Sequence, residues 1–338
     1  MLFCIFMWPF VCRERFWYYI VSVQLASFAK INLKMLESEP RPTWAWGSDI
    51  ASYGCASSFG SPSGHSTRSS NLAFLIILDM FFASDWSRKT YAELKQKSPR
   101  SHIFTFLAVV LVTITFWLAQ LYDRVFLGKH GINQVILGSQ LGIWCACFSH
   151  YVLRDCVFAH ITRLTQKTNA QLSTYREPLG YIGFGSAVIL TSVAITCIVG
   201  LVMNVSGKLQ QEWLINIRDT CGQKFDVDET TGLLVANTNG MYLGTITDYV
   251  SACGILGLYI GEVLFRFSGN RTGLESYSTK GFCFQLITAV TFCGLYQIPI
   301  WVQHEFEVGS LWAQAIFVIA LPHLLIGVTL TYLLPTLM

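Results

Sequence analysis

Long stretches without a charged residue constrain the fold of this chain more than any other feature of its sequence. Residues 103–122, 131–153, 178–207, 281–304 and 308–338 contain no Asp, Glu, Lys or Arg. A helix needs roughly 20 apolar residues to cross the hydrocarbon core of a membrane. Only 13% of all residues are charged, about half the share found in soluble domains. We therefore expect a membrane protein that crosses the bilayer several times. The net charge of only +3 gives no sign of nucleic-acid binding.

Three further apolar segments contain isolated charges, and they complete a predicted set of eight membrane-spanning helices. These segments are residues 16–32, 71–82 and 241–265. Strands of a membrane barrel would alternate apolar and polar residues, and none of the eight segments does so. The expected fold is an all-α polytopic helical bundle that forms one domain over residues 1–338. Residues 1–12 are apolar but too short to cross the membrane, and they are the candidate for part of a ninth helix.

The distribution of basic residues predicts the orientation of the bundle. If the eight helices alternate in direction, one face carries fourteen Lys and Arg residues and the other face carries eight. Cytoplasmic loops are richer in basic residues, so the second face is expected to be non-cytoplasmic. Three short polar segments, at residues 34–42, 62–65 and 124–134, all emerge on that second face.

These three segments carry residues that suit the binding and cleavage of a phosphate ester. Arginine presents a planar fork of donors to phosphate oxygens, and the start of a helix offers free backbone N–H groups. Histidines can supply a nucleophile and a proton donor. The cations are Lys34, Arg41 and Arg124, the helix start carries Ser63 and Gly64, and the histidines are His65 and His130.

The spacing of these residues resembles a three-part signature. Lys34 stands six residues before Arg41-Pro42, the second segment reads Pro62-Ser63-Gly64-His65, and Arg124 stands five residues before His130. This order and spacing resembles the type-2 phosphatidic acid phosphatase superfamily, which also contains glucose-6-phosphatases, dolichyl diphosphate phosphatases and vanadium haloperoxidases. The resemblance covers a motif core within residues 30–152.

Within that superfamily the chain looks most similar to the glucose-6-phosphatase branch. The stretch Thr43-Trp44-Ala45-Trp46 is rich in aromatic residues, and position 134 carries Gln, where lipid phosphatases usually carry Asp. Eight spans also exceed the six that are typical of lipid phosphatases. The resemblance implies a phosphorylated sugar or lipid as substrate, surrounding membrane lipids, and the endoplasmic reticulum as location. It implies no metal and no cofactor.

The resemblance also implies a role for each residue of the site. His130 would attack phosphorus and form a phosphohistidine, and His65 would protonate the leaving oxygen and then activate water. Gln134 would orient the ring of His130. The residues that would hold the phosphate oxygens are Lys34, Arg41, Ser63, Gly64 and Arg124.

Two residues depart from the pattern of the superfamily. Asp123 replaces the usual Ser before Arg124, and it would either repel the substrate or pair with Arg124. Lys129 replaces a small or apolar residue and would offset the charge of Asp123, which would leave an altered but working site. The alternative interpretation is a catalytically weak or inactive member that serves as a structural subunit of a large complex with other membrane proteins, in the mitochondrial inner membrane or another organelle membrane.

The longest predicted loop of the non-cytoplasmic face, residues 205–240, is expected to form a lid over the site and to select the leaving group. Cys55 and Cys221 are the two cysteines in the loops of this face. In an oxidising compartment they would form a disulfide that ties the lid to the active-site loop. Two unrelated free thiols are the alternative.

Overall fold

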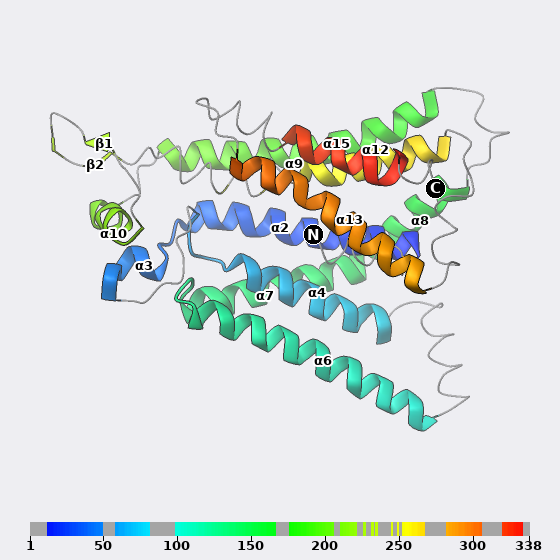
Figure 1. Ribbon diagram of the computed structural model, residues 1–338, viewed down its shortest axis with the longest axis horizontal. Helices are drawn as coiled ribbons and strands as arrows, with labels where there is room; N and C mark the ends of the chain where they lie inside the picture. The colour runs from blue at the N-terminus through cyan, green and yellow to red at the C-terminus, as the bar shows by residue number, and fades with distance from the viewer. Residues whose placement is uncertain are drawn as a thin grey trace. The chain divides into compact units, whose positions relative to one another are not determined.

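The computed structural model is helical, apart from one short β pairing (Figure 1). It describes residues 12–49, 58–81, 99–166, 176–205, 210–221, 226–227, 231–232, 234–235, 245, 249, 252–267, 282–305 and 320–333. The chain divides into two compact units. Unit 1 comprises residues 1–21, 154–197 and 246–338, and unit 2 comprises residues 22–153 and 198–245.

Each segment that the apolar windows predicted contains helix in its described part, and three further helices, Pro42–Trp46, Arg154–Gln166 and Gln211–Cys221, lie outside those segments. The elements in chain order are α2 (Arg13–Glu37), α3 (Pro42–Trp46), η1 (Gly47–Asp49), α4 (Gly64–Phe81), α6 (Pro99–Phe126), α7 (Ile132–Phe148), η2 (Ser149–Leu153), α8 (Arg154–Gln166), α9 (Arg176–Val205), α10 (Gln211–Cys221), β1 (Asp226–Val227), β2 (Leu234–Val235), α12 (Ala252–Phe267), α13 (Phe282–Glu305), α15 (Leu321–Val328) and η5 (Thr329–Leu333). The predicted all-α class is confirmed.

Three helices of the described residues are long and apolar enough to cross a membrane. They are Phe106–Phe126, Ile132–Leu164 and Glu177–Met203, and they overlap three of the eight predicted spans, the second of them extending well past its predicted end at residue 153. These helices indicate an integral membrane protein. The other five predicted spans are not among these three helices, so the count of eight spans remains a prediction. The candidate for a ninth helix, residues 1–12, lies outside the described residues except for its last one.

Within unit 2, α4 makes its most extensive contacts with α7. Two glycines on α7, four residues apart, allow this close approach. A Cβ on Gly138 would lie 2.6 Å from the Ser63 carbonyl oxygen, and a Cβ on Gly142 would clash with the carbonyl of Thr67. Small residues spaced in this way let two membrane helices pack backbone against backbone. The packing fixes the start of α4 against the start of α7, where the predicted site residues lie.

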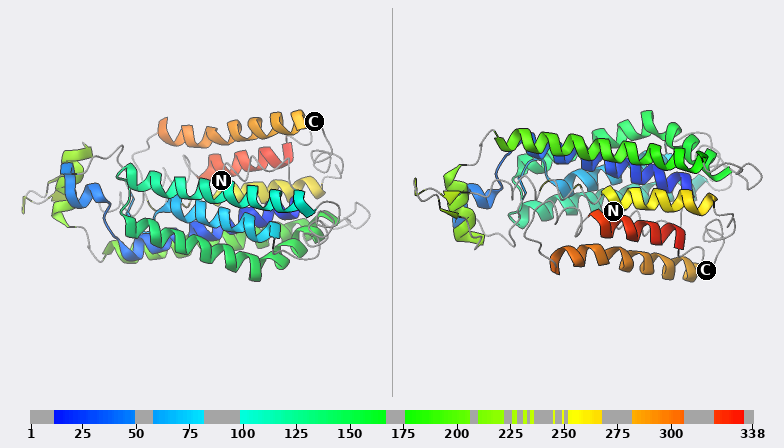
Figure 2. Two further views of the ribbon diagram at one scale, coloured as in Figure 1. Left: turned by 90° about the horizontal axis from the view of Figure 1, so that it is seen from below. Right: turned by 90° about the horizontal axis from the view of Figure 1, so that it is seen from above.

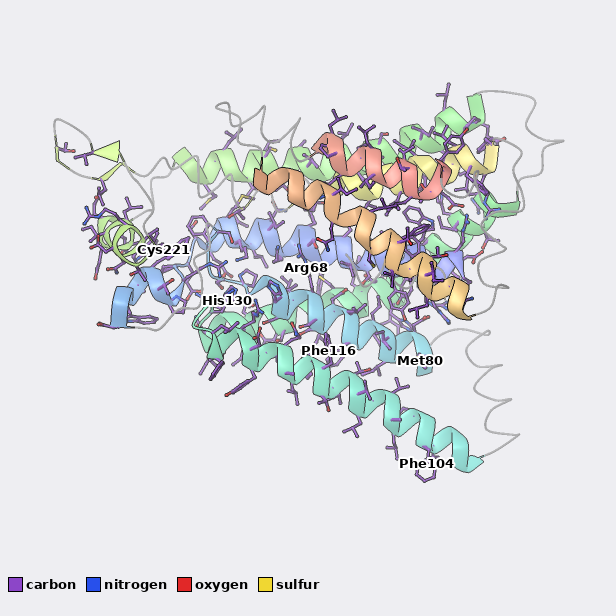
Figure 3. The ribbon with its side chains drawn as sticks, in the orientation of Figure 1. Arg68, Met80, Phe104, Phe116, His130 and Cys221 are labelled. Atoms are coloured by element: carbon purple, nitrogen blue, oxygen red, sulfur yellow. The ribbon has the colours of Figure 1, made fainter. Side chains whose placement is uncertain are left out.

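Polar side chains connect α4 to its other neighbours in unit 2. Asn71 donates to Ser22 Oγ on α2 at 3.1 Å, and Trp117 of α6 donates to Ser70 Oγ at 2.6 Å. The opposite side of α6 is apolar and exposed, and Phe104 points away from the bundle in Figure 3. Such a side is suited to contact with lipid.

The predicted lid segment contains α10 and the hairpin of β1 and β2. Asp226 pairs with Val235 and Val227 with Leu234 in an antiparallel arrangement. Both views of Figure 2 show α10 beside α3, in agreement with the contacts between them. Asn216 of α10 donates to the Trp44 carbonyl at 2.9 Å. The segment is thus anchored directly after Arg41-Pro42.

Unit 1 is held by close packing of α12 against α15. Gly257 and Gly327 lie against the backbone of the opposite helix. Glu262, which is fully buried, pairs with Arg13 and, at 3.1 Å, with Arg266. This charge within an apolar span is therefore part of a buried ion-pair network.

Candidate active site

Backbone hydrogen bonds bring the three predicted motif segments together within unit 2. The Gly60 N–H donates to the Glu39 carbonyl at 2.8 Å, which joins the second segment to the first. The Ser63 N–H donates to the Gln134 carbonyl at 2.9 Å, which joins the second segment to the third. Residues that are about a hundred positions apart in the sequence therefore meet at the starts of α4 and α7.

The ring of His130 is held in one orientation by Gln134. His130 Nδ1 lies 3.3 Å from Gln134 Oε1. The same oxygen accepts the Gly131 N–H at 3.3 Å, while Gln134 Nε2 donates to the Pro40 carbonyl at 2.8 Å. The amide therefore presents its acceptor to the imidazole, and Nδ1 carries the proton. This tautomer leaves a lone pair on His130 Nε2.

The other ring nitrogen of His130 faces a cation. Arg41 Nη1 lies 3.3 Å from His130 Nε2, and the side chain of His130 is only 4% exposed. Burial, followed by the charges of Arg41 and Lys34, lowers the pKa of His130 from 6.5 to about 2, although hydrogen bonds to Gln134 and the Gly60 backbone oppose this shift. His130 is thus a neutral imidazole next to two buried cations.

Backbone carbonyls fix both of these cations. Arg41 Nε donates to the Ser58 carbonyl at 2.7 Å, and Arg41 Nη1 donates to the Lys129 carbonyl at 3.0 Å. Lys34 Nζ donates to the Phe59 carbonyl. Both side chains are buried, so their charges lie where the surrounding protein screens them weakly.

The start of α4 supplies a hydroxyl and backbone donors beside these cations. The Thr67 N–H bonds to the Ser63 carbonyl at 3.0 Å, so Ser63 precedes the first turn of the helix. Ser66 Oγ donates to the buried Ser63 Oγ at 3.0 Å. A Cβ on Gly64 would lie 3.0 Å from Lys30 Cδ and 3.3 Å from Lys30 Nζ. Glycine at this position therefore lets a buried lysine approach the helix start.

His65 is exposed and lies among four cations. Its pKa is lowered from 6.5 to about 4 by partial burial and then by the charges of Arg124, Arg68, Lys30 and Lys129. An anion bound among these cations would offset their charges and raise the pKa again. His65 is thus a group whose protonation responds to the charge of a bound ligand.

Arg124 pairs with Asp123, which is one of the two outcomes expected from the sequence. The side chain of Arg124 is 15% exposed. Within the described residues its Nε is buried and has no hydrogen-bond partner, so this nitrogen remains available to an additional acceptor. The carbonyl of Arg124 accepts the His130 N–H at 3.3 Å, which fixes the loop between α6 and α7.

Cys221, the last residue of α10, is disulfide-bonded. Its predicted partner Cys55 lies outside the described residues, so the Cys55–Cys221 pairing stays a prediction. The closure of a lid by residues 205–240 also stays a prediction, and the structure adds that α10 is docked on α3.

Three residues near the two histidines were missed by the sequence reasoning. Lys30 stands one helical turn before Lys34, Arg68 stands three residues after His65, and Gly60 precedes the second motif. A Cβ on Gly60 would lie 2.5 Å from Gln134 Nε2 and 2.6 Å from Gln134 Oε1. Helical spacing alone could have placed Lys30 and Arg68 on the faces that carry the motif residues. The need for glycine at position 60 depends on contacts that spacing does not reveal.

Comparison with known families supports the resemblance at the level of the superfamily. Comparison with the curated proteins and with the solved structures finds no match, so the glucose-6-phosphatase branch is not confirmed. The match to a family model covers less than half of the chain, but it includes all three motifs. The model of the PAP2 superfamily matches residues 15–158, a range that includes both histidines and every predicted phosphate-binding residue.

Proposed function

We propose that this chain is an integral-membrane phosphatase that hydrolyses a phosphate monoester through a phosphohistidine intermediate. The observation that carries the proposal is the environment of His130. It is buried, neutral, protonated on Nδ1 towards Gln134, and it presents Nε2 towards Arg41. A nucleophilic histidine needs this unprotonated nitrogen next to cations that bind the electrophile.

In the proposed reaction, His130 Nε2 attacks phosphorus and the bond from phosphorus to the ester oxygen breaks. Lys34, Arg41 and Arg124 stabilise the charge on the phosphoryl oxygens as they move towards the transition state. Ser63 and the N–H of Gly64 would add neutral donors at the start of α4. A preorganised set of such donors contributes several kcal/mol in typical enzymes, about 3 kcal/mol for each well-placed one.

His65 acts as the proton donor and acceptor in this proposal. The negative charge of the bound phosphate raises the pKa of His65 from its value of about 4 in the free protein, so that the imidazole can carry a proton to the leaving oxygen. Once the alcohol has left, neutral His65 takes a proton from water. The water oxygen attacks phosphorus, the bond from phosphorus to His130 breaks, and inorganic phosphate leaves.

The candidate substrates are a sugar phosphate such as glucose 6-phosphate and a lipid phosphate. Release of inorganic phosphate from glucose 6-phosphate and from phosphatidate by the purified protein tests them directly. A His130→Ala variant serves as the control for contaminating phosphatases. If the wild-type protein hydrolyses neither of these substrates, this part of the proposal is wrong.

We further propose that the site faces the non-cytoplasmic side, with the endoplasmic reticulum as the location. The asymmetry of basic residues between the two faces supports this side. The disulfide at Cys221 supports it as well, because disulfides persist in oxidising compartments. Accessibility of cysteines introduced into α10 to a membrane-impermeant reagent in sealed microsomes tests the side. Labelling before permeabilisation would contradict it.

One observation favours a different function. Asp123 pairs with Arg124, and a carboxylate beside a phosphate site repels the substrate. This pairing supports an inactive family member that serves as a structural subunit of a large membrane complex. Recovery of the protein in a stable assembly with other membrane proteins, together with no turnover of any phosphate ester, would favour that alternative.

A further inference from the structure

A cavity within unit 1 is formed by the end of α8 and the start of α9. It has a volume of about 350 Å³ and is lined by His160, Glu177, Gly180, Tyr181 and Phe184. This volume lies in the range of small-molecule sites. Phe184 is 59% exposed, while His160 and Tyr181 are partly buried. The cavity therefore opens to the outside of unit 1, and all of its lining residues follow the range that matches the PAP2 superfamily.

Three aromatic rings line this cavity. The ring centroids of His160 and Phe184 lie 5.4 Å apart, and those of His160 and Tyr181 lie 5.5 Å apart. The planes of Phe184 and Tyr181 are tilted by 41° and 57° to the imidazole, so these rings do not stack face to face on it. His160 Nε2 lies 2.8 Å from Tyr259 Oη, which fixes the imidazole. The faces of tyrosine and phenylalanine attract a cation that lies within about 6 Å of the ring centroid.

Charged residues of both signs accompany these rings. Glu177 contributes its carboxyl group to the lining of the cavity. Arg163 is exposed and follows His160 by three residues on α8, so both side chains project from one face of that helix. The charge of Arg163 also acts on His160. The cavity thus combines rings and a carboxyl group, which suit a cation, with a nearby arginine, which suits a phosphate.

The cavity belongs to the ends of two membrane-spanning helices. His160 lies in the last two turns of Ile132–Leu164, and the other lining residues lie in the first two turns of Glu177–Met203. The rise from residue 177 to residue 184 is about 10 Å, at roughly 1.5 Å per residue. Lipid headgroups occupy roughly 5 to 8 Å on each side of the hydrocarbon core, and tyrosine is enriched at this level. The position of the cavity therefore favours a lipid headgroup as its ligand.

We propose that this cavity binds the headgroup of phosphatidylcholine taken from the surrounding bilayer. The trimethylammonium group lies against the rings of Tyr181 and Phe184 near Glu177, and the phosphate group lies beside Arg163. The lining is mainly apolar. A primary ammonium needs acceptors for three N–H groups, whereas a trimethylammonium has no N–H group and is recognised by aromatic faces. The cavity therefore favours choline over ethanolamine. This proposal does not depend on the proposed phosphatase activity.

A series of lipids with identical acyl chains tests the proposal on the purified full-length protein in dodecyl maltoside micelles. The measurement is the equilibrium binding of phosphatidylcholine that carries tritium in its methyl groups, and competition by the other lipids. Phosphatidylcholine should bind at least fivefold more tightly than phosphatidylethanolamine or phosphatidylglycerol. It should also bind at least fivefold more tightly than phosphatidyl-3,3-dimethylbutanol, in which carbon replaces the quaternary nitrogen and the positive charge is absent.

Variants of the lining residues test the contribution of each group. Tyr181→Leu and Phe184→Leu keep apolar side chains but remove a ring, and each should lower the affinity for phosphatidylcholine at least fivefold. Phe184→Tyr keeps the ring and should stay within twofold of wild type. Glu177→Gln should lower the affinity for phosphatidylcholine at least threefold and leave that for the uncharged analogue unchanged. Phe116→Leu on α6 is the matched control, because Phe116 is 58% exposed, and it should bind phosphatidylcholine like wild type.

The results that would overturn the proposal are equally specific. They are equal affinities for phosphatidylcholine, phosphatidylethanolamine and the uncharged analogue, or equal losses in Phe184→Leu and Phe116→Leu. Tighter binding of soluble phosphocholine than of phosphatidylcholine would overturn the bilayer as the source of the ligand. An unchanged thermal midpoint without added lipid shows that a variant is folded. If Tyr181→Leu does not fold, Phe184→Leu still tests the proposal, because its side chain is mostly exposed.

Discussion

Replacement of Gly60 by alanine tests whether the orientation of His130 depends on its support by Gln134. A Cβ at position 60 would lie 2.5 Å from Gln134 Nε2 and 2.6 Å from Gln134 Oε1. Neither atom can remain in place, because ordinary van der Waals contact of a Cβ begins at 3.4 Å. The amide must therefore retreat, and it holds the imidazole of His130 through Nδ1.

The expected size of the effect follows from this displacement. Moving from 2.5 to 3.4 Å shifts the amide by about 1 Å, and a misplacement of that size costs up to about 100-fold in rate. The lost hydrogen bond to the imidazole alone contributes about 1 kcal/mol. We therefore expect kcat for phosphate release to fall by about 10-fold to 100-fold, which corresponds to roughly 1.4 to 2.7 kcal/mol of transition-state stabilisation.

The assay is release of inorganic phosphate from p-nitrophenyl phosphate by purified Gly60→Ala protein. Gly183→Ala is the matched control, because nothing lies within 4 Å of the position of its Cβ, and it should keep wild-type activity. In a Gln134→Ala background, where the clash is absent, Gly60→Ala should lower kcat by less than about threefold more. Full activity of Gly60→Ala, or a full additional loss in the Gln134→Ala background, would refute the reasoning.

Three further predictions concern the charges and packing of the site. Asp123→Ser removes the carboxylate that pairs with Arg124, and kcat/KM for phosphate release should rise by about 3-fold to 10-fold; an unchanged or lower value contradicts this. The pKa of His65 is lowered to about 4, so nitrogen NMR at pH 5 should show a neutral ring. In the unfolded chain this imidazole takes up its proton at the ordinary pKa of 6.5, so the free energy of unfolding falls as pH drops from 6.5 towards 4. An NMR titration midpoint near 6.5 for His65 in the folded protein would contradict the described site. Gly142→Ala places a methyl group against a backbone carbonyl of α4 and should lower stability by about 1–3 kcal/mol, with a lower thermal midpoint than Gly183→Ala.

The sequence predicted that the three motif segments lie together, while the roles of their residues in a site stay predictions. Apolar windows predicted the helices beside the segments of Lys34, Ser63 and His130, and the parity of these helices predicted that the three segments lie on one face. The structure joins these segments through backbone hydrogen bonds. Such a prediction succeeds because each motif lies at a helix end, and because the position of a helix end follows from the length of the apolar segment beside it.

Features that depend on the contact between two helices could not be predicted in this way. The approach of Lys30 to Gly64, and the contact of Gly60 with Gln134, depend on how α2, α4 and α7 pack. The pairing of Gly142 with a carbonyl of α4 is of the same kind. A single sequence shows which residues share a helix face, but it does not show which faces touch.

The apolar windows alone do not determine the number of membrane spans. Residues 16–32 lie within α2, where Lys30 and Lys34 belong to the helix and are buried inside the protein. A helix that contributes charged side chains to a site is less apolar than one that faces lipid, so hydropathy alone separates it poorly from a soluble helix.

The central claim of this account is a covalent phosphoryl intermediate on His130. Brief reaction of the purified protein with a ³²P-labelled substrate, followed by denaturation in alkali and peptide mapping, tests it directly. The account predicts an acid-labile, alkali-stable phosphoryl group on the peptide that contains His130, and its absence from His130→Ala protein. Phosphate release by His130→Ala at the wild-type rate, or turnover by the wild-type protein with no labelled histidine, would contradict the account.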